Sequence, residues 1–193
     1  MTGVRQDAAS RRSAAIGVGL LALALLAVAA VGESLQESLQ WSRADIARGE
    51  WWRLLTGHLV HLDLDHAALN VAALVLLWWL FGDVLPLRDL ALIVIAAVVA
   101  IDAMLWWLVD IDQYRGLSGM LHAYAAAAVV RRIIERHDPL AWIIGVSGLA
   151  KILWENLAGA MPLLAPTIVV VTDVHLAGVL VGMLAGVLLR RGA

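Results

Sequence analysis

Six long apolar stretches, joined by mostly short polar connections, constrain the fold of this chain more than any other feature of its sequence. They cover about residues 14–31, 64–81, 88–109, 117–133, 140–157 and 173–190. A helix of about 20 apolar residues crosses the hydrocarbon layer of a bilayer. Because 62% of the 193 residues are hydrophobic, a soluble domain could not bury them all. We therefore predict an all-α polytopic membrane protein, in which residues 1–193 form a single bundle of six transmembrane helices.

The first apolar stretch also resembles a signal peptide, because Arg5, Arg11 and Arg12 precede it. Its length of about 18 residues is nevertheless sufficient to cross the bilayer. Glu33 follows it, where a cleavage site would carry small uncharged residues. We expect this stretch to be retained as the first transmembrane helix.

The chain contains no cysteine, which excludes disulfides, thiolate nucleophiles and metal sites with cysteine ligands. Covalent catalysis would therefore need an oxygen or nitrogen nucleophile. The net charge is -2 and no basic tract is present, so nothing in the sequence suggests a nucleic-acid partner. We expect no metal ion and no other cofactor.

The distribution of arginines predicts which side of the membrane each connection occupies, because cytoplasmic loops carry the excess of positive charge. With a cytoplasmic N-terminus, nine arginines lie inside and four lie outside. The inner set is Arg5, Arg11, Arg12, Arg88, Arg131, Arg132, Arg136, Arg190 and Arg191, and the outer set is Arg43, Arg48, Arg53 and Arg115. The one long loop, residues 33–56, is then external. Its mixed charge and its tryptophans, Trp41, Trp51 and Trp52, predict an interfacial position.

Polar and small residues gather in the first turns of the second, fourth and sixth predicted helices, which all start at one depth near the outer surface. His66 and Asn70 are separated by four residues, so they lie on one helix face. The other two helices begin with Gly116-Leu117-Ser118-Gly119 and with Thr172-Asp173-Val174-His175, which Gly178 and Gly182 follow. Polar side chains at membrane depth are costly unless they face one another or a wet cavity. These residues are therefore candidates for a functional site.

The residue types suit acyl transfer. A serine hydroxyl becomes a nucleophile when an imidazole accepts its proton, and Ser118 and His175 can supply this pair. The oxyanion that forms needs donors, which His66, Asn70 and the backbone N–H of Ser118 at a helix start can supply. Small residues let helices approach closely, and this predicts structural roles for Gly116, Gly119, Gly178 and Gly182.

The ordered set of residues from about Trp51 to Gly182 resembles the rhomboid family of intramembrane serine proteases. The resemblance lies in Trp52-Arg53-Leu54, His61-x4-His66-x3-Asn70, Gly116-x-Ser118-Gly119 and His175-x2-Gly178-x3-Gly182. It implies a rhomboid-like bundle with a Ser118/His175 dyad and an oxyanion site of His66, Asn70 and the Ser118 amide. It also implies a supporting role for His61, a first loop embedded in the membrane, and movement of the fifth helix for lateral substrate access.

Within that family, three segments resemble the rhombosortase branch: residues 57–61, 114–122 and 151–155. This resemblance implies a protease of the bacterial inner membrane that cuts secreted, membrane-anchored proteins near a C-terminal helix preceded by a Gly-Gly-type motif. A general rhomboid protease acting on other single-span helices is the alternative. Ala123 is a departure, because many rhomboids have glycine there, and it predicts slightly looser packing of the fourth helix.

Several neighbouring polar residues have simpler interpretations. His122 is the rival base for Ser118, but a pair on one helix has less freedom to align, so we favour His175. Asp173 is two residues from His175 and should not face it. Lys151 and Glu155 are spaced to neutralise each other, with substrate gating or recognition as the alternative. We expect Arg53 to anchor the first loop and Asp102 to form a helix-packing hydrogen bond.

Two other classes of function fit part of the pattern. A haem or metal carrier could use His58, His61, His66, His122 and His175, but the Gly-x-Ser-Gly turn would then have no purpose. A non-catalytic client-binding protein or a small transporter is the second alternative. The presence of both Ser118 and His175 disfavours the client binder, and no paired broken helices indicate a transporter.

Overall fold

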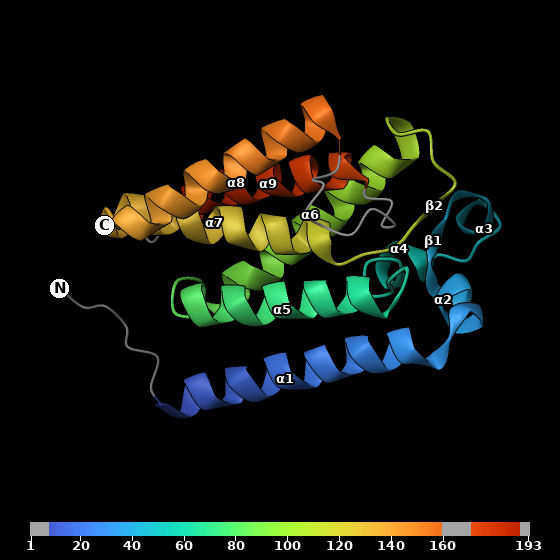
Figure 1. Ribbon diagram of the computed structural model, residues 1–193, viewed down its shortest axis with the longest axis horizontal. Helices are drawn as coiled ribbons and strands as arrows, with labels where there is room; N and C mark the ends of the chain where they lie inside the picture. The colour runs from blue at the N-terminus through green and yellow to red at the C-terminus, as the bar shows by residue number, and fades with distance from the viewer. Residues whose placement is uncertain (1–7, 160–170, 190–193) are drawn as a thin grey trace.

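A computed structural model of the chain describes residues 8–159 and 171–189. Long helices lie side by side, and several short elements cover one end of them (Figure 1). The long helices are α1 (Ala8–Val31), α5 (Leu64–Phe81), α6 (Leu87–Trp107), α7 (Ser118–Arg136), α8 (Pro139–Ala158) and α9 (Thr172–Leu188). The short elements are α2 (Glu33–Leu39), β1 (Trp41–Ser42), α3 (Arg43–Ala47), α4 (Arg53–Thr56) and β2 (Gln113–Tyr114).

The long helices match the six predicted stretches to within a few residues, except that α1 starts earlier, at Ala8. Local signals set several ends. Asp63 caps α5 by accepting from the His66 amide at 2.7 Å, and Asp138 caps α8 in the same way, with Pro139 in its first turn. His137 ends α7 in a left-handed conformation. The predicted sixth helix extends to residue 190, and that last residue lies outside the described part of the chain.

Four described helices are long and apolar enough to cross a membrane: residues Arg11–Val31, Leu64–Phe81, Leu87–Trp107 and Pro139–Ala158. Thr172–Leu188 is a shorter apolar helix. The remaining long helix, α7, carries Arg131, Arg132, Glu135 and Arg136 in its last turns, which reduces its hydropathy. The count of six spans therefore stays a prediction, and four are supported by length and composition.

Helix α7 lies at the centre, and its tightest neighbour is α9. A Cβ built on Gly178 would lie 3.0 Å from the carbonyl carbon of Gly119, and one on Gly182 would lie 2.9 Å from the Cα of Ala123. The two backbones are therefore in direct contact, which only small residues permit. Ala123 is fully buried at this contact. The slightly looser packing predicted from Ala123 stays a prediction, and the backbone of Ala123 lies directly against Gly182 of α9.

The connection between α1 and α5 is held by a buried arginine, Arg53, and a half-buried one, Arg43. Arg53 donates to the carbonyl oxygens of Glu37 and Gln40 at 2.7 and 2.9 Å and pairs with Glu50 at 2.7 Å. Arg43 donates to carbonyl oxygens at the C-terminal end of α6, including that of Trp106 at 2.6 Å. A guanidinium with several donors is well suited to satisfy such unpaired carbonyls.

One expectation for this connection is wrong, and one element in it was not predicted. Trp51 and Trp52 are exposed as predicted, but Trp41 is completely buried and stacks edge-on against Trp106. The described residues are mostly helical, and Trp41 and Ser42 also pair with Tyr114 and Gln113 in a two-stranded antiparallel sheet. A strand of two residues is too short to show an alternating pattern in the sequence. This small sheet joins the first loop to the segment that leads into α7.

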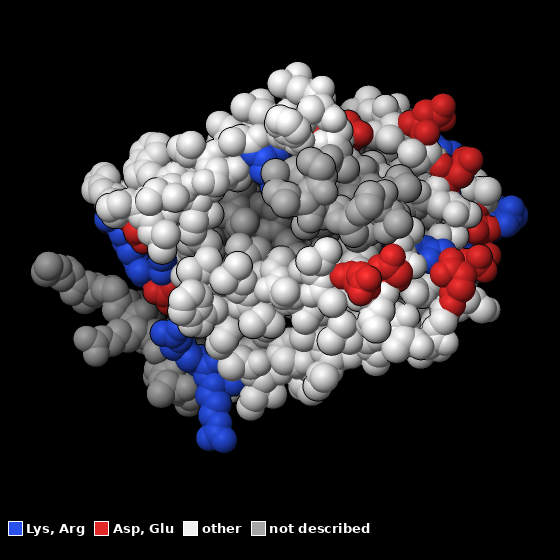
Figure 2. Space-filling view, in the orientation of Figure 1, with Lys and Arg blue, Asp and Glu red and all other residues white. Residues whose placement is uncertain are grey.

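The two ends of the molecule differ in charge. Figure 2 shows Asp and Glu gathered at the end that carries the short elements, and Arg prominent at the opposite end. At that opposite end Arg132 and Arg136 pair with Asp83, which follows α5. This asymmetry is what the predicted sidedness requires, although the identity of the cytoplasmic side stays a prediction. Arg5, Arg190 and Arg191, which contributed to that prediction, lie outside the described residues.

Candidate active site

Ser118 is the first residue of α7, and the turn before it is held by backbone contacts. The Gly116 N–H donates to the Gly57 carbonyl at 3.1 Å, and the Tyr114 hydroxyl donates to the Gly116 carbonyl at 2.6 Å. Gly116 has φ of +143°, and a Cβ there would be 3.2 Å from the His66 ring. Glycine is needed at this position both for the backbone conformation and for the approach of His66.

The structure brings Ser118 and His175 together. His175 Nε2 is 2.8 Å from Ser118 Oγ, although the two residues are 57 apart in the sequence. His175 is in the first turn of α9 and is buried. The close α7–α9 contact through Gly119 and Gly178 lies within one turn of both residues. The glycines therefore let the two helices approach closely enough for the side chains of Ser118 and His175 to reach hydrogen-bond distance.

A third residue joins this pair, and sequence reasoning missed its role. Glu155 Oε2 is 2.9 Å from His175 Nδ1, while Glu155 Oε1 accepts from Lys151 Nζ at 2.7 Å. The ion pair with Lys151 is present as the i, i+4 spacing suggested, but the carboxylate also contacts the histidine. The available signal was the presence of two charged residues in an otherwise apolar helix, which marks functional sites in membranes.

His122 does not contact the serine hydroxyl. Its Nδ1 is 2.7 Å from the Ser118 carbonyl oxygen, its Nε2 is 3.2 Å from Lys151 Nζ, and its ring stacks on His175 with centroids 4.2 Å apart. The side chain therefore packs against the favoured base instead of replacing it. Asp173 is exposed, and the acidic partner of His175 is Glu155. The stacked arrangement also differs from two axial ligands that face each other across a haem.

The predicted oxyanion residues lie on α5 beside the serine turn. The Asn70 amide donates to the His66 carbonyl at 3.0 Å, which uses one of its two N–H groups. The His66 ring borders Gly116, and its Nδ1 is buried without a protein partner. His66 is thus beside the turn that leads into α7, and both residues have donor capacity that the described protein atoms do not use.

His61, between α4 and α5, lies against His66. The two rings meet edge to face with centroids 5.1 Å apart. The His61 ring is completely buried and neither nitrogen has a protein partner, while its backbone N–H donates to Gln36 at 3.0 Å. Burial lowers the pKa of His61 to about 4, and the neighbouring His66 acts in the same direction. His61 is therefore neutral at pH 7.

Asp102 on α6 has a partner that the sequence did not suggest. Its Oδ1 is 3.2 Å from Nε2 of His58, whose ring is fully buried and contacts Tyr114 edge to face. This contact ties α6 to the segment before α5. The contact of the His58 ring with Tyr114 and the Gly116–Gly57 backbone hydrogen bond hold this segment against the residues that lead into Ser118.

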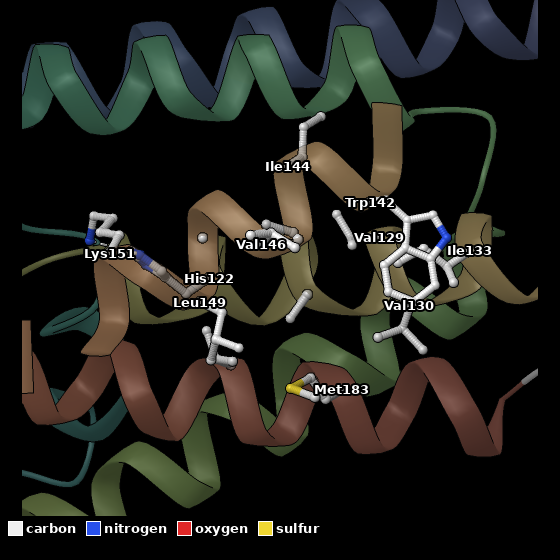
Figure 3. Close-up of a pocket in the computed structure, with 15 residues that line it drawn as sticks. His122, Val129, Val130, Ile133, Trp142, Ile144, Val146, Leu149, Lys151 and Met183 are labelled. Atoms are coloured by element: carbon white, nitrogen blue, oxygen red, sulfur yellow. Dashed lines mark hydrogen bonds between the residues drawn. The ribbon is translucent and has the colours of Figure 1, made fainter. Parts of the chain in front are cut away.

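A cavity of about 270 Å³ lies between α7, α8 and α9 (Figure 3). His122 and Lys151 border one end of it, and Ile133 and Trp142 border the other (Figure 3). Apart from the two polar residues at the first end, apolar side chains and glycine line this space. Helix α8 therefore borders this space along part of its length, while its last turns contact His175.

The comparison with known proteins gave one match. A model of the Rhomboid domain family matches residues 48–192, which is three quarters of the chain. The matched range includes the starts of α5, α7 and α9 and therefore every residue of the candidate site. No curated protein matches the chain.

Proposed function

The chain belongs to the rhomboid family of intramembrane serine proteases, and from this premise we propose that it is an active membrane endopeptidase. The nucleophile in this proposal is Ser118 and the general base is His175. The observation that carries it is the 2.8 Å distance between Ser118 Oγ and His175 Nε2. Some members of the family are inactive, so an aligned nucleophile and base is the feature that favours catalysis over client binding.

The reaction follows from this geometry. Ser118 Oγ attacks the carbonyl carbon of the scissile peptide bond while His175 Nε2 takes the hydroxyl proton. The tetrahedral oxyanion is stabilised by the Ser118 amide, which is at a helix start and has no partner within the helix. His175 then gives its proton to the leaving amine. Water hydrolyses the acyl-enzyme by the same route.

His66 and Asn70 supply the remaining oxyanion donors in this proposal. The second N–H of Asn70 and a ring N–H of His66 are the groups available. If Asn70 stabilises the oxyanion, Asn70→Ala should lower kcat about 10- to 1000-fold. An unchanged kcat for a membrane substrate in proteoliposomes would leave Asn70 with only its contact to the His66 carbonyl.

Substrates in this proposal are membrane-anchored proteins cut near the outer face of the bacterial inner membrane, with both termini of the enzyme in the cytoplasm. The segments that resemble the rhombosortase branch favour secreted proteins with a C-terminal Gly-Gly-type motif, a helix and a basic tail. Such a helix would reach the site laterally past α8. The cavity beside α8 supports this route, because it leaves room for α8 to move.

The test uses a tagged substrate of that design, co-expressed with the protein and followed by its change in size. The wild type should shorten the substrate, whereas Ser118→Ala and His175→Ala should each be inactive while still folded in the membrane. A fluorophosphonate probe should label the wild type at Ser118. Cleavage by either variant, or labelling at another residue, would contradict the proposed nucleophile and base.

A second substrate separates the two branches of the proposal. An ordinary single-span helix without the Gly-Gly motif serves as the matched control. Cleavage of the motif-bearing protein alone would favour rhombosortase specificity. Cleavage of the control alone would favour a general rhomboid protease.

A further inference from the structure

The carboxylate of Glu155, on α8, lies at hydrogen-bond distance from the base that the proposed function assigns. Its Oε2 is 2.9 Å from His175 Nδ1, and His175 Nε2 is 2.8 Å from Ser118 Oγ. We propose that Glu155 is a positioning residue that completes a Ser118–His175–Glu155 triad, an inference that rests on the proposed function. It replaces the two-residue dyad that the sequence resemblance implied.

Glu155 determines which ring nitrogen of His175 carries the proton. An ionised carboxylate can only accept hydrogen bonds, so Nδ1 carries the hydrogen when it is paired with Glu155. Nε2 is then left with a free lone pair that points at the serine hydroxyl. Glu155 therefore selects the tautomer in which His175 can act as a base.

The buried charge of Glu155 is compensated by a neighbouring lysine. Glu155 is only 3% exposed, and an unpaired anion at such a position would be strongly unfavourable. Lys151 Nζ donates to its other oxygen at 2.7 Å and so compensates the charge. Because the lysine takes Oε1, Oε2 remains available to His175. The ion pair and the triad contact are therefore compatible.

His122 helps to orient the ring of His175. His122 Nδ1 is 2.7 Å from the Ser118 carbonyl oxygen, so it must donate there, and its Nε2 then accepts from Lys151 at 3.2 Å. The His122 ring stacks on His175 with an angle of 20° between the planes. The base is thus held at its edge by Glu155 and on its face by His122.

This arrangement assists the chemical step. When Ser118 Oγ attacks the peptide carbonyl, its proton moves to Nε2 and His175 becomes a cation between the serine and the carboxylate. Glu155 stabilises that cation through the Nδ1–H hydrogen bond without taking the proton. The cation then returns the Nε2 proton to the leaving nitrogen. The negative charge of Glu155 contributes most when His175 is charged, so its effect should be on kcat.

A role in gating makes a different prediction from a role in positioning. If the Lys151–Glu155 pair only controlled access of the substrate helix, its loss would slow protein cleavage but leave the serine as reactive as before. If Glu155 positions the base, the serine itself loses reactivity. A small fluorophosphonate probe reports this reactivity without the need to admit a helix.

The experiment compares the wild type, Glu155→Gln, Glu155→Asp and Ser118→Ala in proteoliposomes. We expect Glu155→Gln to lower kcat about 10²- to 10⁴-fold with little change in KM, as for loss of the acid in other serine protease triads. The rate of probe labelling should fall in parallel, and Glu155→Asp should retain more of both rates than Glu155→Gln. Wild-type labelling of Glu155→Gln would overturn the inference, whether or not protein cleavage is slowed.

Two further variants separate positioning from folding. Lys151→Met/Glu155→Gln removes both charges and leaves no buried ion unpaired, so it should fold and show the same loss of kcat and labelling. Glu155→Ala should regain part of its kcat when formate is added, but not when sodium chloride is added at equal ionic strength. Wild-type rates in the double variant, or equal effects of formate and chloride, would contradict positioning.

Ser118→Ala distinguishes failure of this inference from failure of the proposed function. Cleavage by Ser118→Ala at the wild-type rate would remove the proposed function and the triad together. An inactive Ser118→Ala beside a fully active Glu155→Gln would remove the triad alone.

Discussion

Helices α8 and α9 both pack on α7, but they do so in opposite ways. Helix α9 contacts α7 more extensively than any other element, through glycines that bring the two backbones together. Helix α8 borders the cavity beside α7 and contacts His122 and His175 near its end, through Lys151 and Glu155. The first interface fixes the distance between Ser118 and His175. The second contains a cavity, and in the proposed function it is the interface that opens for the substrate.

The largest effect should come from substitutions at the α7–α9 contact. A side chain at Gly178 meets the backbone of Gly119, which cannot shift without moving Ser118. Gly178→Val should therefore abolish activity and most of the folded protein, measured by protease resistance in membranes and by substrate cleavage. Gly148→Val on α8 is the matched control, because a Cβ there meets nothing within 4 Å. Equal damage from both variants would show that the two interfaces do not differ.

The second effect tests the mobility of α8 directly. A Cβ on Gly145 lies 3.1 Å from a methyl group of Val129 on α7, and the chain has no native cysteine. Oxidised Val129→Cys/Gly145→Cys should lose most cleavage of a membrane substrate, keep the probe labelling of Ser118, and recover on reduction. The two single variants are the controls. Full cleavage by the oxidised protein would contradict movement of α8.

A smaller effect concerns the loss of stability in acid that His61 causes. This residue lies between α4 and α5 and is completely buried. The folded-state pKa of His61 is lowered to about 4, while an unfolded chain takes up a proton near pH 6.5. Because the unfolded chain binds a proton at His61 more readily than the folded protein does, acid favours unfolding. The contribution of His61 to the free energy of unfolding is fully present above about pH 6.5 and is lost as the pH falls towards 4, by at most about 1.4 kcal/mol per pH unit.

Thermal unfolding in detergent at pH 7 and pH 5 measures this acid effect. The wild type should lose more stability between the two pH values than His61→Leu, which cannot take up a proton at that position. An equal loss in both proteins would show that another group causes the acid sensitivity.

The smallest expected effect is a gain in stability from a substitution in α8. Gly148 lies within α8 with open space around it, and glycine inside a helix costs roughly 0.5–1 kcal/mol relative to alanine. Gly148→Ala should stabilise the protein by about that amount and leave cleavage close to the wild-type rate. A loss of stability would mean that the space beside α8 is occupied in the membrane.

The helices and the pair of Ser118 and His175 could be predicted from the sequence for clear physical reasons. Apolar runs of membrane-spanning length have few alternatives to helices, since backbone groups in lipid must be paired within the chain. Polar residues are rare in such runs, so Ser118 and His175 were conspicuous. The burial of Trp41 was not readable, because an aromatic residue beside charged ones fits an interface equally well. The contact of Asp102 with His58 depended on the path of the first loop.

The sequence by itself determined that the chain is a helical membrane protein and which polar residues its helices carry at their starts, because hydropathy and helix periodicity are local properties. Only the tertiary structure decided that Glu155 contacts His175. The spacing of Lys151 and Glu155 is satisfied by a simple ion pair, and the contact of Glu155 with His175 requires α8 and α9 to meet at one angle and depth. Such a meeting is set by the packing of helices on a third one, which no local pattern encodes.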